Sequence, residues 1–270
     1  MLTYSFMRIA LYVSILLGIS IPLIGSSAVF KRLSSSGDAL AHSSLAGIAI
    51  GLAAGLNPLV ISIITCIVAF FIIELLRKKF NKYSEIGVSI VLSASIALAG
   101  ILSSFSSAAN FDSYLFGSIL LISNTELYIT IALTIIIVLF SIIFYHQNFA
   151  ILYSSNESKV SSIKVNQLTI LQDLLLSITI AIASKIVGSL VVSSLIVLPV
   201  ACGLQLKRGY KITMIASIII SIISMVSGLT ISYYASLKPG ATIVAVSIGI
   251  LIILFIYNKI TEKVRKKQQI

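Results

Sequence analysis

Long apolar stretches constrain this chain more than any other feature of its sequence. A helix needs about 20 apolar residues to cross the hydrocarbon core of a bilayer. In lipid a helix also satisfies its own backbone hydrogen bonds, which an open strand does not. The sequence therefore predicts an all-α, polytopic transmembrane helix bundle of about nine spans. The spans are expected at residues 6–30, 37–56, 57–76, 86–104, 126–145, 167–184, 186–204, 212–234 and 241–258.

The span count depends on a few short interruptions. The first span and the pair 37–56 and 57–76, which one Asn-Pro dipeptide separates, are the least defined, so eight or ten spans are the alternatives. The run 115–123 is too short to span and is expected to be re-entrant or a short surface helix. No linker or low-complexity segment divides the chain, which predicts a single transmembrane domain over residues 1–270.

Charge supports a membrane location and predicts an orientation. Charged residues make up 10% of the chain, against about 25% in soluble domains. The formal net charge of +11 comes from short basic clusters between apolar runs, which is typical of cytoplasmic loops and argues against a nucleic-acid partner. We expect a multi-pass protein of the bacterial inner membrane, with a retained first span, an outside N-terminus and an inside C-terminus. All basic residues except Arg8, Lys185 and Lys238 then lie inside, in segments 31–36, 77–85, 146–166, 205–211 and the tail.

Two ionisable residues near the start of the second predicted span are the main candidates for chemistry. An ionisable residue within a span is costly and calls for a reason. In a helix Asp38 and His42 are four residues apart and share one face. A carboxylate and an imidazole on one face suit zinc or manganese better than calcium or magnesium. Two alternatives remain open: Asp38 caps the helix N-terminus after Gly37, and His42 is a hydrogen-bonded interior histidine.

Other polar residues in the spans carry less information. Asp173, beside Gln172, either faces a water-filled cavity or is a buried carboxylate bonded to a neighbouring hydroxyl, and the second reading is favoured. Cys66 and Cys202 lie in apolar runs and are expected to be small buried hydrophobes. The sequence contains no phosphate-binding loop and no hydrolase or Cys-x-x-Cys pattern. We therefore expect no enzyme activity from this chain alone and no permanently bound cofactor.

Three sequence blocks resemble the zinc/manganese-type family of metal ABC transporter permeases, and the zinc permeases most. The first is Phe30-Lys31-Arg32 followed by the segment Gly37–Gly47, which contains Asp38 and His42. The second runs from Lys185 to Ala201, and the third joins Ser232-Tyr233-Tyr234 to Gly240–Val244. The blocks occur in the family's order and spacing, and the similarity covers nearly the whole chain.

The resemblance implies a function, a set of partners and a path for metal. It implies the permease subunit of a bacterial ABC importer that moves a divalent metal into the cytoplasm, with Zn²⁺ first and Mn²⁺ next. The implied partners are separate cytoplasmic ATPase subunits, an extracytoplasmic metal-binding protein and a second permease copy, within membrane lipid. It also implies that Asp38 and His42 line the metal path, with water completing the metal's shell.

The predicted cytoplasmic segment 146–166 resembles the family's coupling helix, which docks into the ATPase. The family usually has a glycine where this chain has Ser162. The coupling residues are expected to be Asn156, Glu157, Ser158, Lys159, Val160, Ser161 and Ser162.

Two other functions are considered for a bundle of this composition. A proton-driven secondary metal carrier would be expected to show an inverted repeat with charged residues at matching places in both halves, which is not evident in this sequence. A non-transporting membrane scaffold would have no need of an Asp–His pair inside the membrane.

Overall fold

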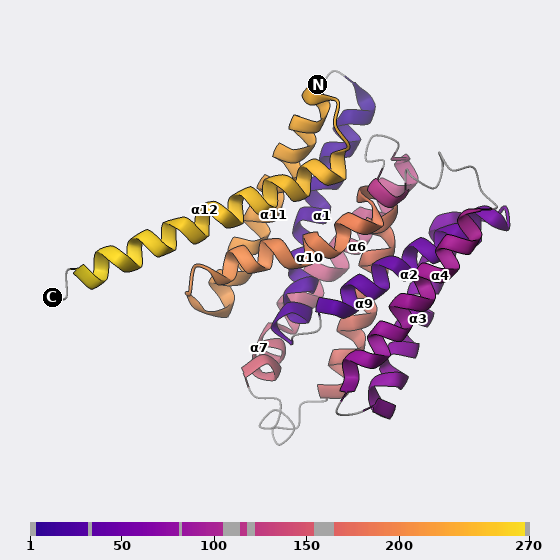
Figure 1. Cartoon of the computed structure of the whole chain (residues 1–270), viewed down its shortest axis with the longest axis horizontal. Coiled ribbons are helices and arrows are strands. Elements are labelled where there is room, and N and C mark those ends of the chain that lie inside the picture. Colours follow the sequence, from indigo (N-terminus) through magenta and orange to yellow (C-terminus); the bar gives the residue numbers. More distant parts are fainter. Residues whose placement is uncertain are drawn as a thin grey trace.

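The computed structural model describes residues 4–31, 34–80, 83–104, 114–117, 122–153 and 165–267, and in these ranges the chain is helical, without strands. The expected coupling residues, 156–162, lie outside the described residues. The helices are α1 (Ser5–Phe30), α2 (Ser34–Ala53), α3 (Pro58–Phe80), α4 (Ser84–Ser103), α6 (Asn124–Ile143), α7 (Tyr145–Tyr153), α9 (Val165–Val187), α10 (Ser189–Leu204), α11 (Gly209–Ala235) and α12 (Pro239–Lys267), shown in Figure 1.

Each apolar stretch predicted from the sequence corresponds to one helix, with shifted ends. α2 begins at Ser34 rather than at residue 37, and α12 continues to Lys267. The Asn-Pro pair between the second and third stretches marks a helix start: the Asn57 side chain accepts a hydrogen bond from the Leu59 N–H at 3.0 Å, and Pro58 is the first residue of α3. Proline is favoured at this position because its missing N–H would have no partner there.

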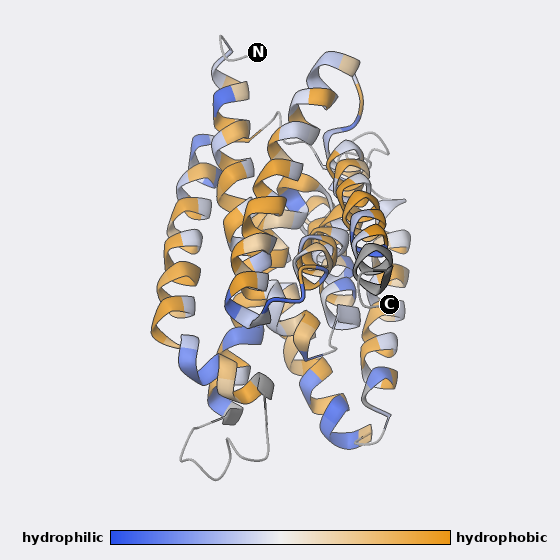
Figure 2. Ribbon diagram, turned by 90° about the vertical axis from the view of Figure 1, so that its left-hand side faces the viewer, coloured by the Kyte–Doolittle hydropathy of each residue, from blue (hydrophilic) through white to orange (hydrophobic). Residues whose placement is uncertain are grey.

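The long helices alternate in direction, so that their basic ends meet. At this end, Arg77 of α3 donates a hydrogen bond to Ser36 of α2, and Phe30 of α1 lies 5.4 Å from the Tyr210 ring of α11. Asn258 of α12 donates to the backbone carbonyl that follows α10. We call this end of the bundle the basic end. Figure 2 shows hydrophobic residues along the middle of the helices and hydrophilic residues gathered at helix ends.

Seven of the helices are long and apolar enough to cross a membrane: α1, α3, α4, α6, α9, α11 and α12. Among the described residues the prediction of an all-helical bundle is therefore confirmed, while the count of about nine spans is not. α10, with 16 residues, is apolar but short. α2 has 20 residues, yet its serines, aspartate and histidine make it more polar. Both pack against several other helices, so protein rather than lipid surrounds much of their length.

Small residues allow the helices to approach closely at their crossings. A Cβ atom at Gly47 would lie 2.7 Å from the Ser62 Cα, where α2 meets α3. A Cβ atom at Gly228 would lie 2.6 Å from the Ile243 Cα, where α11 meets α12. Between α9 and α10, Gly188 has a φ of 105°, which a side chain would strain. This glycine lets the chain turn directly from one helix into the next.

Candidate functional site

α2 lies inside the bundle and packs against α3, α4, α9 and α10. From Ser36 to Ala49 every residue of this helix is buried except Asp38 and His42. In this part of α2, only these two ionisable side chains are therefore partly accessible from outside the protein. Because they are four residues apart, they lie on one face, one helical turn from each other.

The geometry of this pair fits a shared ligand. Asp38 Oδ1 lies 3.9 Å from His42 Nε2, and the side chains are 45% and 18% exposed, respectively. α2 begins at Ser34, so Asp38 is inside the helix and does not cap it. The capping alternative for Asp38 is thus wrong. A cation between the two side chains would meet one carboxylate oxygen and one imidazole nitrogen, the donor types that zinc accepts.

Two donors alone do not complete a metal shell. Among the described residues no group of three or more His, Cys, Asp or Glu side chains is placed to hold a metal ion. Since structural zinc sites have four protein ligands, the pair is an open site rather than a closed structural one. Water or groups from another molecule have room to complete it, because Asp38 is nearly half exposed.

Hydroxyl groups fix the opposite faces of α2. Ser43 donates to the Ala39 carbonyl and shares a 2.8 Å hydrogen bond with Ser95 of α4. Ser44 shares another of 2.8 Å with Ser62 of α3. These buried contacts hold the helix to its neighbours, so the orientation of Asp38 and His42 is set by packing elsewhere on α2.

A cluster of charged residues joins three helices, α1, α3 and α9, at the basic end. Lys31 of α1 donates a hydrogen bond to the Gln172 side chain of α9 at 3.1 Å. Next to Gln172, Asp173 is buried, and the charges of Lys31 and Arg77 act on its carboxylate. Burial lowers the pKa of the Lys31 ammonium from its ordinary value, and the Asp173 charge opposes this shift. We call Lys31, Arg77 and Asp173 the basic-end cluster.

The surroundings of Asp173 agree with a buried carboxylate and not with a residue that faces a wide water-filled cavity. The cavity that it lines with Ser36 and Arg77 has a volume of about 10 Å³, which is room for about one water molecule. The charges of Lys31 and Arg77 act on the Asp173 carboxylate, and Ser36 lines the same cavity. The residue is a buried carboxylate and does not line a wide aqueous path.

At the other end of the bundle an ion pair ties α6 to α9. Lys185, in the last turn of α9, contacts Glu126. The Glu126 carboxylate also accepts a hydrogen bond from the Ser123 N–H at 2.9 Å and completes a capping box at the start of α6. The Ser-x-x-Glu pattern is a recognisable helix start, so the capping box of Ser123 and Glu126 could be predicted from the sequence. The ion pair with Lys185, which lies 59 positions further along the chain, could not be predicted in this way.

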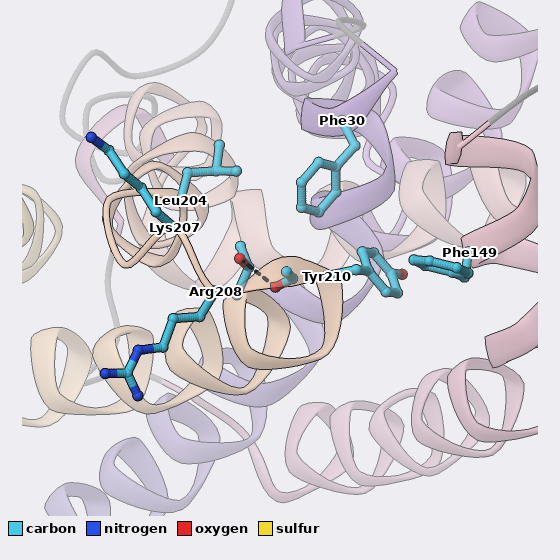
Figure 3. A pocket seen from close by; sticks show the side chains of 8 residues that line it. Phe30, Phe149, Leu204, Lys207, Arg208 and Tyr210 are labelled. Atoms are coloured by element: carbon cyan, nitrogen blue, oxygen red, sulfur yellow. Dashed lines mark hydrogen bonds between the residues drawn. The ribbon is translucent and has the colours of Figure 1, made fainter.

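The short helix α7 follows α6 at the basic end and is held there by aromatic rings. Its Tyr145 and Phe149 rings lie 5.8 and 5.9 Å from the ring of Tyr210. The rings of Phe30, Tyr210 and Phe149 line a cavity of about 250 Å³, and Figure 3 shows the charged ends of Lys207 and Arg208 pointing away from them. This packing fixes the start of the segment that the sequence predicts to contact an ATPase.

The bundle and the burial pattern of α2 together define the class: a polytopic membrane protein with an ionisable Asp–His pair on an inner helix. The model of the ABC 3 transport family matches residues 3–258. The chain belongs to this family of ABC transporter membrane subunits, and it is a multi-pass protein of the inner membrane, as the sequence predicts.

Curated relatives agree on metal transport but name different metals. A probable metal transport system membrane protein of Treponema pallidum is 36% identical over 96% of this chain and 98% of its own length. A high-affinity zinc uptake system membrane protein of Buchnera aphidicola is 30% identical over 86% of this chain and 90% of its own. A manganese transport system membrane protein of Listeria monocytogenes is 28% identical over 95% and 92%.

A solved structure shares the fold. PsaBC from Streptococcus pneumoniae, in complex with Fab, superposes with a TM-score of 0.84 and 26% sequence identity, over 93% of this chain and 91% of the other. The helical arrangement described here thus belongs to a fold with an experimental example.

Proposed function

We propose that this chain is the permease subunit of a bacterial ABC importer for a divalent metal, in which Asp38 and His42 form a transit site. Family membership places the chain in an ABC transporter. The observation that carries the site is the burial pattern of α2, where these two residues alone are open from Ser36 to Ala49. An ionisable pair inside the membrane calls for a functional reason, and the partial exposure of both side chains leaves room for a ligand.

Zinc is the first candidate for this ligand and manganese the second. Imidazole suits zinc well, and a carboxylate accepts either metal. Relatives named for zinc and for manganese are similarly distant from this chain, at 30% and 28% identity. The donor pair therefore argues for divalent metal as a class, and the order of preference rests on the histidine.

A second copy of the chain is the proposed partner within the membrane. Two donors from one copy leave a metal shell incomplete, and a site that must release its ion should be weakly held. Across a two-fold axis each copy would supply one carboxylate and one imidazole. Water would take the place of either pair when the two copies separate.

We further propose that nine helices cross the membrane, with α2 and α10 among them. If α2 did not cross, Arg77, Lys78 and Lys79 would lie outside, against the rule that basic loops stay in the cytoplasm. The low hydropathy of α2 is no obstacle, because other helices surround it. Both termini keep their sides in either case: the N-terminus outside and the C-terminus inside.

Energy and cargo come from partner proteins in this proposal. A cytoplasmic ATPase would press on the segment after α7, residues 156–162, and a metal-binding protein would deliver the ion from outside. α7 contacts α11 through Tyr145, Phe149 and Tyr210. A push on the segment would thereby reach the bundle as a rigid-body motion.

The test of this function is metal uptake driven by ATP. Vesicles that contain the chain, its ATPase and its binding protein are loaded with ATP, and uptake of radioactive zinc and manganese is followed. Uptake should require ATP and stop when the ATPase carries a disabled phosphate-binding loop. Metal uptake that continues without ATP but follows a proton gradient would instead support a secondary carrier. If no metal moves in either condition, the scaffold alternative gains and the proposal fails.

A further inference from the structure

A groove on the membrane-facing side of α1, α6 and α11 has no part in the function proposed above. Its volume is about 610 Å³, within the range of small-molecule sites. It opens at the basic end, beside α7. Its lining residues are Ile19, Leu23, Val138, Ser141, Ile142, Tyr145, His146, Lys211, Met214, Ile215 and Ile218; we call it the α1–α6–α11 groove.

The body of this groove is apolar and lies within helices that are long enough to cross the membrane. Ile142 and Ile215 at its rim are 68% and 46% exposed. At this depth water is absent, so the occupant of the groove must itself be apolar and thin enough to lie between helices. An acyl chain of a phospholipid meets both conditions.

The end of the groove has the opposite chemistry. Tyr145, His146 and Lys211 lie there, at the cytoplasmic ends of α6 and α11, and both His146 and Lys211 are exposed. The lining contains no acid, and no ion pair between described residues involves Lys211. Arg208, one turn earlier, adds a further positive charge. These groups are suited to a phosphate at the depth of the headgroups.

A protein occupant fits this groove less well. A second copy would bring its own basic loops, with a net charge of +11 per chain, against the same end. A soluble ATPase would not reach the apolar body of the groove. Lipid of the cytoplasmic leaflet is at the right depth and carries the complementary charge.

We propose that the α1–α6–α11 groove binds an anionic phospholipid of the cytoplasmic leaflet. One acyl chain lies between α1, α6 and α11, and the phosphate accepts hydrogen bonds from Lys211 Nζ, the His146 ring and Tyr145 Oη. The bound lipid joins α7 to the start of α11, next to the Tyr145–Tyr210 ring contact of 5.8 Å.

The chain has no tryptophan, which gives a clean fluorescence test. Ile215→Trp places a single reporter at the groove, and Ile253→Trp places one on the exposed side of α12. Each full-length variant is reconstituted in phosphatidylcholine vesicles that contain a minor fraction of a brominated lipid, whose bromine quenches nearby tryptophan. In one sample the brominated lipid is phosphatidylglycerol, and in a parallel sample it is phosphatidylcholine. We expect the groove reporter to show about a threefold to tenfold preference for the anionic lipid over brominated phosphatidylcholine. The α12 reporter should show none.

Substitutions at the polar end decide whether the groove causes the preference. Lys211→Gln with His146→Gln, made in the Ile215→Trp background, should remove it, while Lys259→Gln, at the cytoplasmic end of α12, should leave it intact. Size-exclusion elution confirms that each variant stays folded. Equal quenching by both lipids would mean ordinary boundary lipid and overturn the proposal. A preference that survives the double substitution, or one that inorganic phosphate abolishes, would also overturn the proposal. An unquenched reporter would overturn it as well, because it would indicate that a protein covers the groove.

Discussion

At the scale of single residues, the sequence located the candidate site but not its surroundings. The spacing of Asp38 and His42 predicts a shared helix face, and the structure places their oxygen and nitrogen atoms 3.9 Å apart. That only these two residues between Ser36 and Ala49 are not buried could not be predicted. Burial depends on which faces α3, α4, α9 and α10 cover, and this information is not local. The role of the pair as metal ligands stays a proposal.

The identity of residue 42 should set the metal preference. His42→Asp replaces the imidazole by a second carboxylate, which manganese accepts better than zinc does. We expect the ratio of zinc to manganese uptake to fall by about tenfold, the size of effect seen when metal-site groups change. Competition between the two isotopes in one vesicle preparation measures the ratio directly. Ser35→Ala, an exposed change on the same helix, is the control and should leave the ratio as it is.

At the scale of elements, apolar runs predicted the existence of every long helix, while contacts between helices escaped prediction. The basic-end cluster shows why. Lys31, Arg77 and Asp173 come from α1, α3 and α9 and are far apart in sequence. Their proximity follows from the packing of the bundle. The sequence predicts that Arg77 and Lys31 belong to cytoplasmic loops, and in the structure their charges act on a buried carboxylate.

Removing that carboxylate should loosen the basic end of the bundle. Asp173→Ala leaves the part-buried Lys31 without its main neighbouring carboxylate, while Arg77 keeps its ion pair with Glu74, and we expect a cost of about 3 kcal/mol. The thermal unfolding midpoint of the detergent-solubilised chain should therefore fall by about 5–10 °C. Glu85→Ala removes an exposed carboxylate at the start of α4 and should change the midpoint little. Equal midpoints for the two variants would show that Asp173 is not a stabilising counter-ion.

At the scale of the whole molecule, charge predicts orientation and the helix count decides which loops face outside. A nine-crossing chain places Leu56 outside and Tyr83 inside. If only the seven long apolar helices cross, Leu56 lies inside and Tyr83 lies outside. Leu237 lies outside in both arrangements. The sequence alone could not choose, because the polar α2 and the short α10 qualify as spans only when their protein neighbours are known.

Cysteine labelling separates the two arrangements. The native Cys66 and Cys202 are buried, so cysteines introduced at Leu56, Tyr83 and Leu237, each more than half exposed, are the reactive ones. An impermeant maleimide applied to spheroplasts should label Leu56→Cys and Leu237→Cys, and should label Tyr83→Cys only after the membrane is opened. Labelling of Tyr83→Cys in sealed spheroplasts, with Leu56→Cys protected, would mean that α2 does not cross.

The central claim, that metal passes Asp38 and His42, is tested most directly by ATP-driven zinc uptake in single variants. Asp38→Ala and His42→Ala are compared with wild type and with Glu85→Ala, at equal amounts of assembled transporter in the vesicles. Each site variant should lose at least about tenfold in uptake rate, while Glu85→Ala keeps the wild-type rate. Uptake that persists at the wild-type rate in both site variants would contradict the account and place the metal path elsewhere in the bundle.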